Sequence, residues 1–166
     1  MATLRRSIVA SVLFTAFGGP FLVLIVFPWL ITRFRLPVQE SAWRVGVAVT
    51  LIVLGLVPLF ESIVRFVVVG RGSLMPTVPT EHLVVSGLYR FVRNPMYVGV
   101  LTVIAGEGLL FRSFELAGYL VAVWIGCSIF VIFYEERRLA RSFGVEYLRY
   151  KKHVPRWLPR VLPWRG

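Results

Sequence analysis

Four long apolar runs, separated by polar and charged segments, dominate the chain. The first extends from Ile8 to Ile31 without a charged residue. As a helix, its 24 residues span about 36 Å, more than the roughly 30 Å apolar core of a bilayer. The run is too long for the apolar part of a signal peptide and ends without a cleavage motif. We therefore expect a retained transmembrane helix, kinked at Gly18-Gly19-Pro20.

The second run, Val45 to Phe60, leads into a segment that contains Glu61 and Arg65. These two residues are four positions apart, so they can form an ion pair on one face of a helix. We therefore expect the second helix to continue beyond its apolar part and past the lipid headgroups.

The third and fourth runs lie close together in the sequence. The third opens at Pro95 and ends at Phe111, and the fourth extends from Leu116 to Tyr134. Asn94 is a favourable N-cap and proline a favourable first helical residue, so the third helix is predicted to begin at Pro95. Because so few residues separate the two runs, they are predicted to form a tight antiparallel helical hairpin.

After Tyr134 the chain becomes amphipathic. Leu139, Phe143 and Tyr147 recur every four residues among arginines, which is typical of a helix lying along a membrane surface. In the proline-rich tail that follows, Trp157 and Trp164 suit an anchor at the membrane interface.

The complete pattern predicts one all-α domain over residues 1–166, a polytopic membrane helical bundle. It comprises about four transmembrane helices, two of them within residues 1–70, and a cytoplasmic amphipathic C-terminal helix.

The distribution of Lys and Arg predicts how this bundle is oriented in the membrane. The chain has 19 Lys and Arg against 8 acidic residues, a net charge of +11. If four helices cross the membrane, fifteen Lys and Arg fall on the side of both termini and four on the other side. The positive-inside rule then places both termini in the cytoplasm. Because the basic residues flank apolar runs, we interpret them as membrane-facing, in contact with lipid headgroups, and expect no nucleic-acid partner.

Two polar groups inside the apolar runs are left outside the candidate site. Cys127 is the single cysteine, which excludes an internal disulfide, and no Cys/His cluster predicts a metal site. Glu107 lies deep in the third run, where an acid is a functional candidate. It is also close to Arg112 in sequence, so a paired or snorkelling acid fits equally well.

The segment between the second and third runs concentrates polar groups at the membrane edge. Arg93 directly precedes a predicted helix N-terminus, where free N–H groups and the helix dipole favour an anion. Tyr89 and Tyr97 offer aromatic surface and hydroxyl groups. On spacing alone, a capped helix start with interfacial side chains explains these residues as well as an anion site does.

Two adjacent acids, Glu135 and Glu136, follow the fourth run. Acids at a helix C-terminus are unfavourable against the macrodipole, so they require a partner. Pairing with Arg137, Arg138 or Arg141 is one explanation, and a ligand that is cationic or carries hydroxyl groups is the other. The hairpin would place this acidic pair at the same membrane depth as residues 94–95, an arrangement that suits a zwitterionic ligand.

The order and spacing of several motifs resemble a family of membrane methyltransferases, the isoprenylcysteine carboxyl methyltransferases and phospholipid N-methyltransferases. The similar stretch runs from about Glu81 to Pro159. The matching elements are Leu83-Val84 with Ser86-Gly87 and Tyr89; Arg93-Asn94-Pro95-Met96-Tyr97 with Gly99; Glu135-Glu136; and Phe143-Gly144 with Glu146-Tyr147, Tyr150 and Val154-Pro155. The resemblance implies that residues 71–166 form a methyltransferase-like core that binds S-adenosylmethionine without a Rossmann fold.

The resemblance also implies a set of cofactor contacts, to which we add Arg93 for its place at a helix N-terminus and Glu136 beside Glu135. The candidate cofactor-binding residues are Glu81, His82, Leu83, Val84, Tyr89, Arg93, Asn94, Pro95, Met96, Tyr97, Glu135 and Glu136.

Two positions depart from the family pattern. Asn94 stands where the family usually has histidine, and an amide cannot titrate near neutral pH. Val131 stands where the carboxyl methyltransferases have an arginine that is taken to hold the substrate carboxylate. The loss of that cation argues against a carboxylate acceptor.

The predicted function is methyl transfer from S-adenosylmethionine to a hydrophobic or lipid-like acceptor, with membrane lipids as partners. Glu136 and His82 are candidates for a general base, and the catalytic residue is left unassigned. The alternatives are a phospholipid headgroup amine N-methyltransferase and a non-catalytic membrane scaffold or partner protein. A nicotinamide-dependent membrane reductase of similar helical build is a further option.

Overall fold

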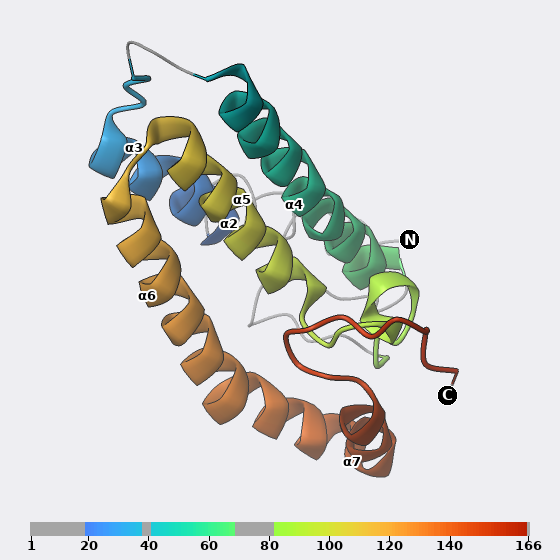
Figure 1. The fold of residues 1–166 in the computed structure, drawn as a ribbon. Coiled ribbons are helices and arrows are strands. Elements are labelled where there is room, and N and C mark those ends of the chain that lie inside the picture. The colour runs from blue at the N-terminus through green and yellow to red at the C-terminus, as the bar shows by residue number, and fades with distance from the viewer. Residues whose placement is uncertain (1–18, 38–40, 69–81, 166) are drawn as a thin grey trace.

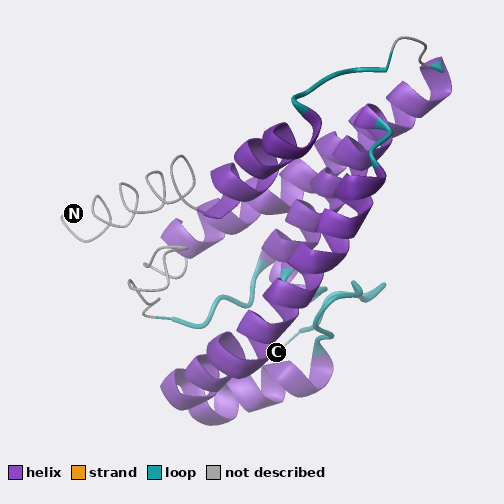
Figure 2. Ribbon diagram, turned by 90° about the vertical axis from the view of Figure 1, so that its left-hand side faces the viewer, coloured by secondary structure: helices purple, strands orange, loops and turns teal. Residues whose placement is uncertain are grey.

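A computed structural model describes residues 19–37, 41–68 and 82–165, and every regular element in these ranges is helical (Figures 1 and 2). The first helical stretch comprises α2 (Gly19–Phe21), the π-turn η1 (Leu22–Val26) and α3 (Phe27–Thr32). The longer α4 (Ala42–Val68) follows. The second half of the chain contains the 3₁₀ turn η2 (Gly87–Arg90), α5 (Pro95–Phe111), α6 (Phe114–Phe130), the π-turn η3 (Val131–Glu135) and α7 (Glu136–His153).

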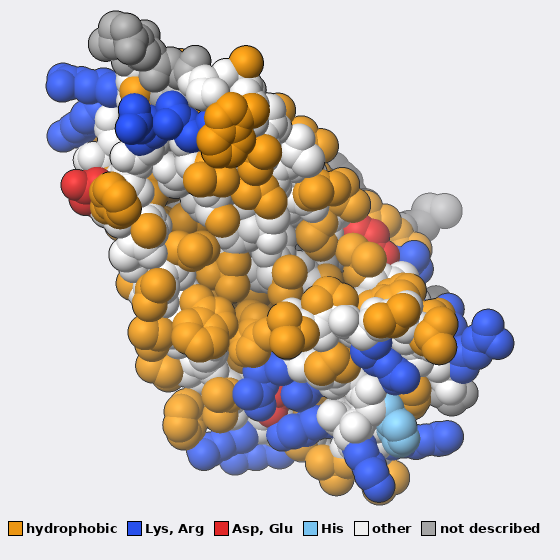
Figure 3. Space-filling model, viewed as in Figure 1, with side chains coloured by type: hydrophobic (Ala, Val, Ile, Leu, Met, Phe, Trp, Pro, Cys, Tyr) orange, Lys and Arg blue, Asp and Glu red, His pale blue; other side chains and the backbone are white. Residues whose placement is uncertain are grey.

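Two of the described helices are long and apolar enough to cross a membrane. They are residues Ala42–Arg65 of α4 and the continuous helix from Phe114 to His153. In the most apolar stretch of each helix, only 22% and 11% of the residues are buried within the protein, so most of their apolar side chains face outward. The helices Gly19–Thr32 and Pro95–Phe111 are also apolar but shorter. In Figure 3, apolar side chains cover the middle of the visible face, and Lys and Arg gather toward its two ends.

The helices α4 and α5 approach each other through glycine. A Cβ at Gly99 would lie 2.5 Å from the Gly55 carbonyl oxygen, and one at Gly106 would lie 2.8 Å from that of Ala48. Backbones can pack this closely only where no side chain intervenes, as at many interfaces between membrane helices. A buried cluster seals the same region, with Leu59 of α4 packed among Val100, Val103 and Ile104 of α5 and Leu24 of η1.

The predicted hairpin of the third and fourth runs is present as α5 and α6. The prediction for α5, Pro95 to Phe111, matches the structure. Arg112 ends α5 in the left-handed conformation at φ 50°, and the Ser113 side chain caps α6 by accepting a hydrogen bond from the Leu116 N–H. The turn is therefore as short as the sequence indicates, and α6 begins two residues earlier than its apolar run.

The fourth helix does not stop at Tyr134. It passes through the π-turn η3 directly into α7, and the bend within α7 lies at Gly144, which has φ 50°. The predicted amphipathic helix is therefore present, but it continues α6 without a break. Its apolar face packs Tyr147 and Tyr150 against residues of the segment before η2, including Leu83.

Residues 154–165, here called the C-terminal strap, fold back across the start of α5 (Figure 1). Backbone N–H groups of Arg160 and Trp164 donate to the carbonyls of Phe91 and Arg90, each at 2.9 Å, and the N–H of Arg93 donates to Pro155 at 2.9 Å. The Trp164 ring lies against Tyr150 and His153. The strap is thus fastened to the segment before α5 at three backbone positions.

Candidate functional site

The turn η2 is seated on α4 by the ion pair that the sequence predicts there. Arg65 Nε donates to Glu61 Oε1 at 2.8 Å, and the same oxygen accepts from the Leu88 N–H at 3.4 Å. Gly87 begins the turn at φ 57°, and a Cβ there would overlap the Glu61 carboxylate. Only glycine satisfies both the backbone angle and the space, so this glycine allows η2 to sit against α4.

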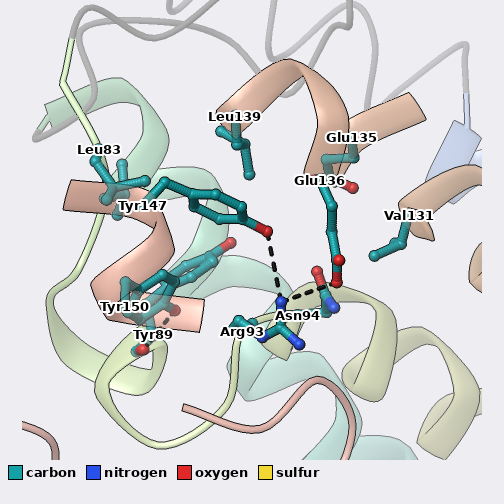
Figure 4. Close-up of a pocket in the computed structure, with 11 residues that line it drawn as sticks. Leu83, Tyr89, Arg93, Asn94, Val131, Glu135, Glu136, Leu139, Tyr147 and Tyr150 are labelled. Atoms are coloured by element: carbon teal, nitrogen blue, oxygen red, sulfur yellow. Dashed lines mark hydrogen bonds and ion pairs between the residues drawn. The ribbon is translucent and has the colours of Figure 1, made fainter. Parts of the chain in front are cut away.

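Glu136 is the centre of a charge cluster where α5 and α7 begin, and Figure 4 shows its contact with Arg93. The side chain of this acid is 6% exposed and contacts three cations. Its distances are 2.8 Å to Arg93 Nη1, 2.7 Å to Arg156 Nε and 2.7 Å to Lys151 Nζ. Burial alone would raise the pKa of Glu136, but the hydrogen bonds from Arg156 and Lys151 and the charge of Arg93 lower it below its ordinary value. Glu136 is therefore an ionised structural anchor at neutral pH.

One hydrogen-bond donor of Arg93, its Nε, makes no hydrogen bond to a described residue. Its Nη1 donates to Glu136 and lies 3.5 Å from the Tyr147 hydroxyl. Its Nε is buried and has no hydrogen-bond partner among the described residues. A buried donor without a partner is costly, and such groups are rare unless water, an ion or a ligand completes them.

Glu135 makes a separate contact on the other side of the same turn. The Tyr97 hydroxyl of α5 donates to Glu135 Oε2 at 3.2 Å. The ring of Tyr97 in turn lies 6.5 Å from that of Trp157 in the C-terminal strap, measured between centroids. The two neighbouring acids therefore differ, because Glu136 contacts three cations directly, whereas Glu135 accepts a hydrogen bond from a neutral phenol and is affected by the charge of Arg138 alone among the cations.

A cavity of about 70 Å³ lies between these groups. It is lined by Leu83, Val84, Tyr89, Arg93, Asn94, Val131, Glu135, Glu136, Leu139, Tyr147 and Tyr150. Burial raises the pKa of Tyr147 to about 12 and also raises the pKa values of Tyr89 and Tyr150. All three phenols therefore stay protonated at neutral pH, and the Tyr150 hydroxyl donates a hydrogen bond to the Tyr89 carbonyl at 2.7 Å. The wall is aromatic and uncharged, and the floor carries the acids and Arg93.

Comparison with known proteins gives this site a family context. The family model of phospholipid methyltransferases matches residues 43–146, from α4 to the middle of α7. The chain belongs to the phospholipid methyltransferase family. This result agrees with the resemblance seen in the sequence and covers most of the residues that line the cavity.

Individual relatives of this methyltransferase family member are named for more than one acceptor. The protein-S-isoprenylcysteine O-methyltransferase of Xenopus laevis is 44% identical over 80 residues, covering 48% of this chain and 27% of that protein. The protein-S-isoprenylcysteine O-methyltransferase B of Arabidopsis thaliana is 31% identical over 130 residues, covering 74% of this chain and 63% of that protein. The methanethiol S-methyltransferase 1 of Bradyrhizobium diazoefficiens is 32% identical over 78 residues, covering 47% of this chain and 25% of that protein.

This chain thus covers less than two thirds of the length of each of these relatives. No solved structure matches it significantly.

The structure brings most of the candidate cofactor-binding residues together. Those that line the cavity are Leu83, Val84, Tyr89, Arg93, Asn94, Glu135 and Glu136. Pro95, Met96 and Tyr97 continue from it along the first turn of α5. His82 is exposed in the bend before this segment, and Glu81 lies outside the described residues. Among the described residues, no group of three or more His, Cys, Asp or Glu is arranged to hold a metal ion.

Two local interpretations from the sequence hold only in part. The charge of Arg138 acts on Glu135, but Glu136 pairs with Arg93, Lys151 and Arg156. Asn94 occupies the N-cap position of α5, but its side chain makes no capping bond. Its amide instead donates to the Arg156 carbonyl at 3.2 Å, because the strap passes directly beside it.

Sequence reasoning missed part of the cavity wall and the strap's contribution. Leu139, Tyr147 and Tyr150 line the cavity. Tyr147 and Tyr150 belong to the motifs that carry the family resemblance, and Leu139 and Tyr147 belong to the apolar face of α7. Either pattern could have predicted that these residues line the site. Arg156 follows the last of these motifs, and nothing in its sequence context indicates that it reaches Glu136. Glu107, left outside the candidate site, is 8% exposed in α5.

Proposed function

We propose that this chain is an integral membrane methyltransferase that transfers a methyl group from S-adenosylmethionine to a hydrophobic or lipid-like acceptor. The observation that carries the proposal is the cavity beside α5. The side chains of Glu135 and Arg93 both line it, and Arg93 Nε is buried without a hydrogen-bond partner among the described residues. The cavity also lies in a chain of the phospholipid methyltransferase family, whose relatives are named as methyltransferases.

The donor set of the cavity fits this cofactor. The methionine part of S-adenosylmethionine carries a carboxylate and an ammonium, and the ribose carries hydroxyl groups. Arg93 Nε suits the carboxylate, and Glu135 suits the ammonium or the hydroxyls. We propose as the cofactor site Glu81, His82, Leu83, Val84, Tyr89, Arg93, Asn94, Pro95, Met96, Tyr97, Glu135 and Glu136.

The cavity must enlarge to hold the whole cofactor. Its volume of about 70 Å³ is well below the roughly 300 Å³ at which small-molecule pockets begin. The aromatic wall on α7 lies beyond Gly144, whose φ of 50° marks the bend of that helix. We propose that this part of α7 moves outward when the cofactor enters.

The residues of the chain act by alignment rather than by proton transfer. When bound, the cofactor supplies an electrophilic methyl group: an acceptor lone pair bonds to the carbon while the carbon–sulfur bond breaks and its electrons stay on sulfur. Such a displacement gains most from orientation and exclusion of water. Glu136 is a poor base because three cations stabilise its ionised form, and His82 is exposed outside the cavity. An acceptor that arrives unprotonated needs no base.

A second candidate acceptor is an amine, such as that of a phospholipid headgroup. Val131 is 1% exposed and places an aliphatic wall where related carboxyl methyltransferases have an arginine. Glu135, which also lines the cavity, would repel a carboxylate acceptor, whereas a neutral amine brings the lone pair that the displacement needs. These two features favour an amine or an uncharged nucleophile over a carboxylate.

We further propose that the whole chain forms one membrane domain with four crossings and both termini in the cytoplasm. The two long helices and the two shorter apolar helices support the crossings, and the excess of Lys and Arg on one side supports the orientation. The site would then face the cytoplasmic leaflet, where a soluble cofactor and a lipid-like acceptor can both reach it.

The first experiment is calorimetric titration of S-adenosylmethionine and its demethylated product into purified protein. We expect saturable binding that weakens at least tenfold in Glu135→Gln, a variant that can still accept the Tyr97 hydrogen bond. NADPH is the comparison ligand and should not bind.

Absence of cofactor binding by a folded sample would overturn the proposal and leave a membrane scaffold or partner protein. NADPH binding would point to a reductase. Cofactor binding without methyl transfer into any lipid extract would support a non-catalytic role.

A further inference from the structure

The C-terminal strap contributes one cation to the junction around Glu136. Arg156 Nε donates to Glu136 Oε1 at 2.7 Å, and Arg93 Nη1 donates to the same oxygen at 2.8 Å. The side chains of Arg156 and Arg93 are 27% and 10% exposed. Arg93 lines the cofactor cavity, whereas Arg156 is not among the lining residues. The strap therefore reaches the cavity indirectly, through a carboxylate that it shares with Arg93.

The backbone fixes the place from which Arg156 extends. The N–H of Arg93 donates to the Pro155 carbonyl at 2.9 Å, and the Asn94 side-chain amide donates to the Arg156 carbonyl at 3.2 Å. Both bonds hold this part of the strap beside the residues that precede α5, and neither involves the Arg156 side chain. A substitution of that side chain therefore removes its contact with Glu136 and leaves these two bonds in place.

The contacts of Glu136 decide how Arg93 uses its donors. An arginine and a carboxylate frequently form a bidentate pair, in which two N–H groups of the guanidinium bond to the acid. Arg93 bonds to Glu136 through Nη1, and its Nε is buried with no hydrogen-bond partner among the described residues. Arg93 and Arg156 fill both acceptor sites of Oε1, and Oε2 accepts from Lys151 at 2.7 Å. Three cations thus hold the carboxylate in one orientation, and it cannot turn toward Nε.

The same junction has more positive than negative charge. Three cations contact the single carboxylate of Glu136. The other acid that lines the cavity, Glu135, accepts a hydrogen bond from Tyr97 at 3.2 Å instead. An added anion is favoured beside such a cluster, because partly buried charges are screened less than charges in water.

We propose that Arg156 is a positioning residue for the cofactor: by sharing Glu136 with Arg93, it keeps the Arg93 Nε–H available for the carboxylate of S-adenosylmethionine. The inference rests on the proposed methyltransferase function and adds how the site recognises its cofactor. Without Arg156, the Glu136 carboxylate can turn and pair with Arg93 through two bonds. That pairing would occupy the donor that the cofactor needs, so the strap controls cofactor affinity without touching the cofactor.

Removing the charge of Arg156 tests the proposal. Calorimetric titration compares two ligands, the demethylated product of the cofactor and the same molecule without its carboxylate. We expect the unmodified protein to bind the first about tenfold more tightly, because only that ligand can use a charge-assisted hydrogen bond from Arg93. In Arg156→Gln this preference should largely disappear, while the affinity for the decarboxylated ligand stays unchanged.

Two further variants separate positioning from general damage to the strap. Arg156→Lys keeps a cation for Glu136 and should restore the preference for the ligand with a carboxylate. Arg160→Gln is the matched control, because the Arg160 side chain donates to the His153 carbonyl at 2.8 Å, and this variant should behave as the unmodified protein. If Arg156→Gln weakens both ligands equally, or leaves the preference intact, the positioning role is wrong.

A measurement on the unmodified protein covers the case in which Arg156→Gln does not fold. Nitrogen-15 NMR of arginine-labelled protein follows the Nε–H signal of Arg93, assigned through its nuclear Overhauser contacts with the neighbouring Tyr147 ring. We expect this signal to shift with the demethylated product and to stay in place with the decarboxylated ligand. Equal shifts with both ligands would overturn the proposal.

The same titrations distinguish the two levels of the argument. If the unmodified protein binds neither ligand, the methyltransferase function fails, and the role of Arg156 fails with it. If the unmodified protein binds both ligands equally well, the cofactor site stands and only the positioning role of Arg156 is wrong.

Discussion

The α4–α5 interface and the junction around Glu136 hold the same helix, α5, by opposite means. From Gly99 to Gly106, α5 lies against α4 with glycine at the points of closest approach and an apolar cluster beside them. At its start, α5 is held by a buried carboxylate, three cations and the backbone bonds of the C-terminal strap. Packing positions the scaffold, and charge and hydrogen bonds position the site.

The difference shows why the site can have unused bonding capacity. Close packing leaves no room for change, because each atom already touches a neighbour. In the polar junction, geometry is set by a few directional contacts, so a group such as Arg93 Nε can be held in place without being satisfied. The first region therefore tolerates no added volume, and the second tolerates no lost charge.

Removing the charge of Glu136 should have the largest effect on stability. Glu136→Gln leaves Arg93 buried without its counter-ion, a situation that costs about 3–5 kcal/mol when a buried ion pair is broken. We expect a correspondingly lower free energy of unfolding in detergent, measured by denaturant titration. Glu135→Gln is the matched control and should be nearly as stable as the unmodified protein. Equal losses in both variants would refute the anchoring role of Glu136.

Adding one methyl group to the glycine interface should have the next largest effect. In Gly99→Ala the new Cβ meets backbone atoms of α4, and we expect a loss of about 1–3 kcal/mol, as for other overpacked interiors. Gly126→Ala on α6 is the control, because no described atom lies within 4 Å of its added Cβ. Thermal unfolding of the two variants gives the difference, and similar melting temperatures would contradict close approach of α4 and α5.

Low pH should destabilise the junction around Glu136 and leave the glycine interface between α4 and α5 unchanged. The pKa of Glu136 in the folded protein is below its ordinary value of 4.5. Its contribution to stability is therefore complete above about pH 4.5 and is lost as pH falls through the lower folded pKa. Melting temperatures measured across this range should fall more for the unmodified protein than for Glu136→Gln. If the difference in melting temperature between the two proteins stays constant with pH, ionisation of Glu136 is not the source of the acid sensitivity.

The half-exposed ion pair on α4 should matter least. The Arg65 side chain is 36% exposed, and exposed pairs of this spacing contribute about 0.3–0.5 kcal/mol. Arg65→Gln should therefore change the free energy of unfolding by less than 1 kcal/mol in the same denaturant titration. A loss as large as that of Glu136→Gln would mean that burial does not explain the strength of the junction.

Local features of this fold were predictable from the sequence, and contacts between distant residues were not. The limits of α5, the α5–α6 hairpin and the Glu61–Arg65 pair depend on residues within a few positions of one another. Capping, proline preference and helical spacing are enough to predict them.

The partners of Glu136 illustrate the limit. Arg138 lies three residues after Glu135, and its charge acts on that acid, as helical spacing allows. Glu136 has no arginine at this spacing, and the structure pairs it with Arg93 and Arg156, which come from other segments. The direction of the strap decides this outcome, and no local pattern in the sequence encodes that direction. The family resemblance predicted most of the residues of the candidate site, because it groups motifs from distant segments around one ligand. The spacing of residues along a single helix cannot predict such a grouping.

The strap also bears on the order of events during synthesis. Because a chain folds from its N-terminal side as it is made, α5 and α6 can pack before Arg160 and Trp164 exist to bond with Phe91 and Arg90. Until then, Glu136 lacks one of its three cations, Arg156, and the ring of Tyr97 lacks its neighbour Trp157. The helices α4, α5 and α6 can therefore pack against one another before the junction around Glu136 is complete. The candidate site reaches its final form only when the strap has folded back onto the segment before α5.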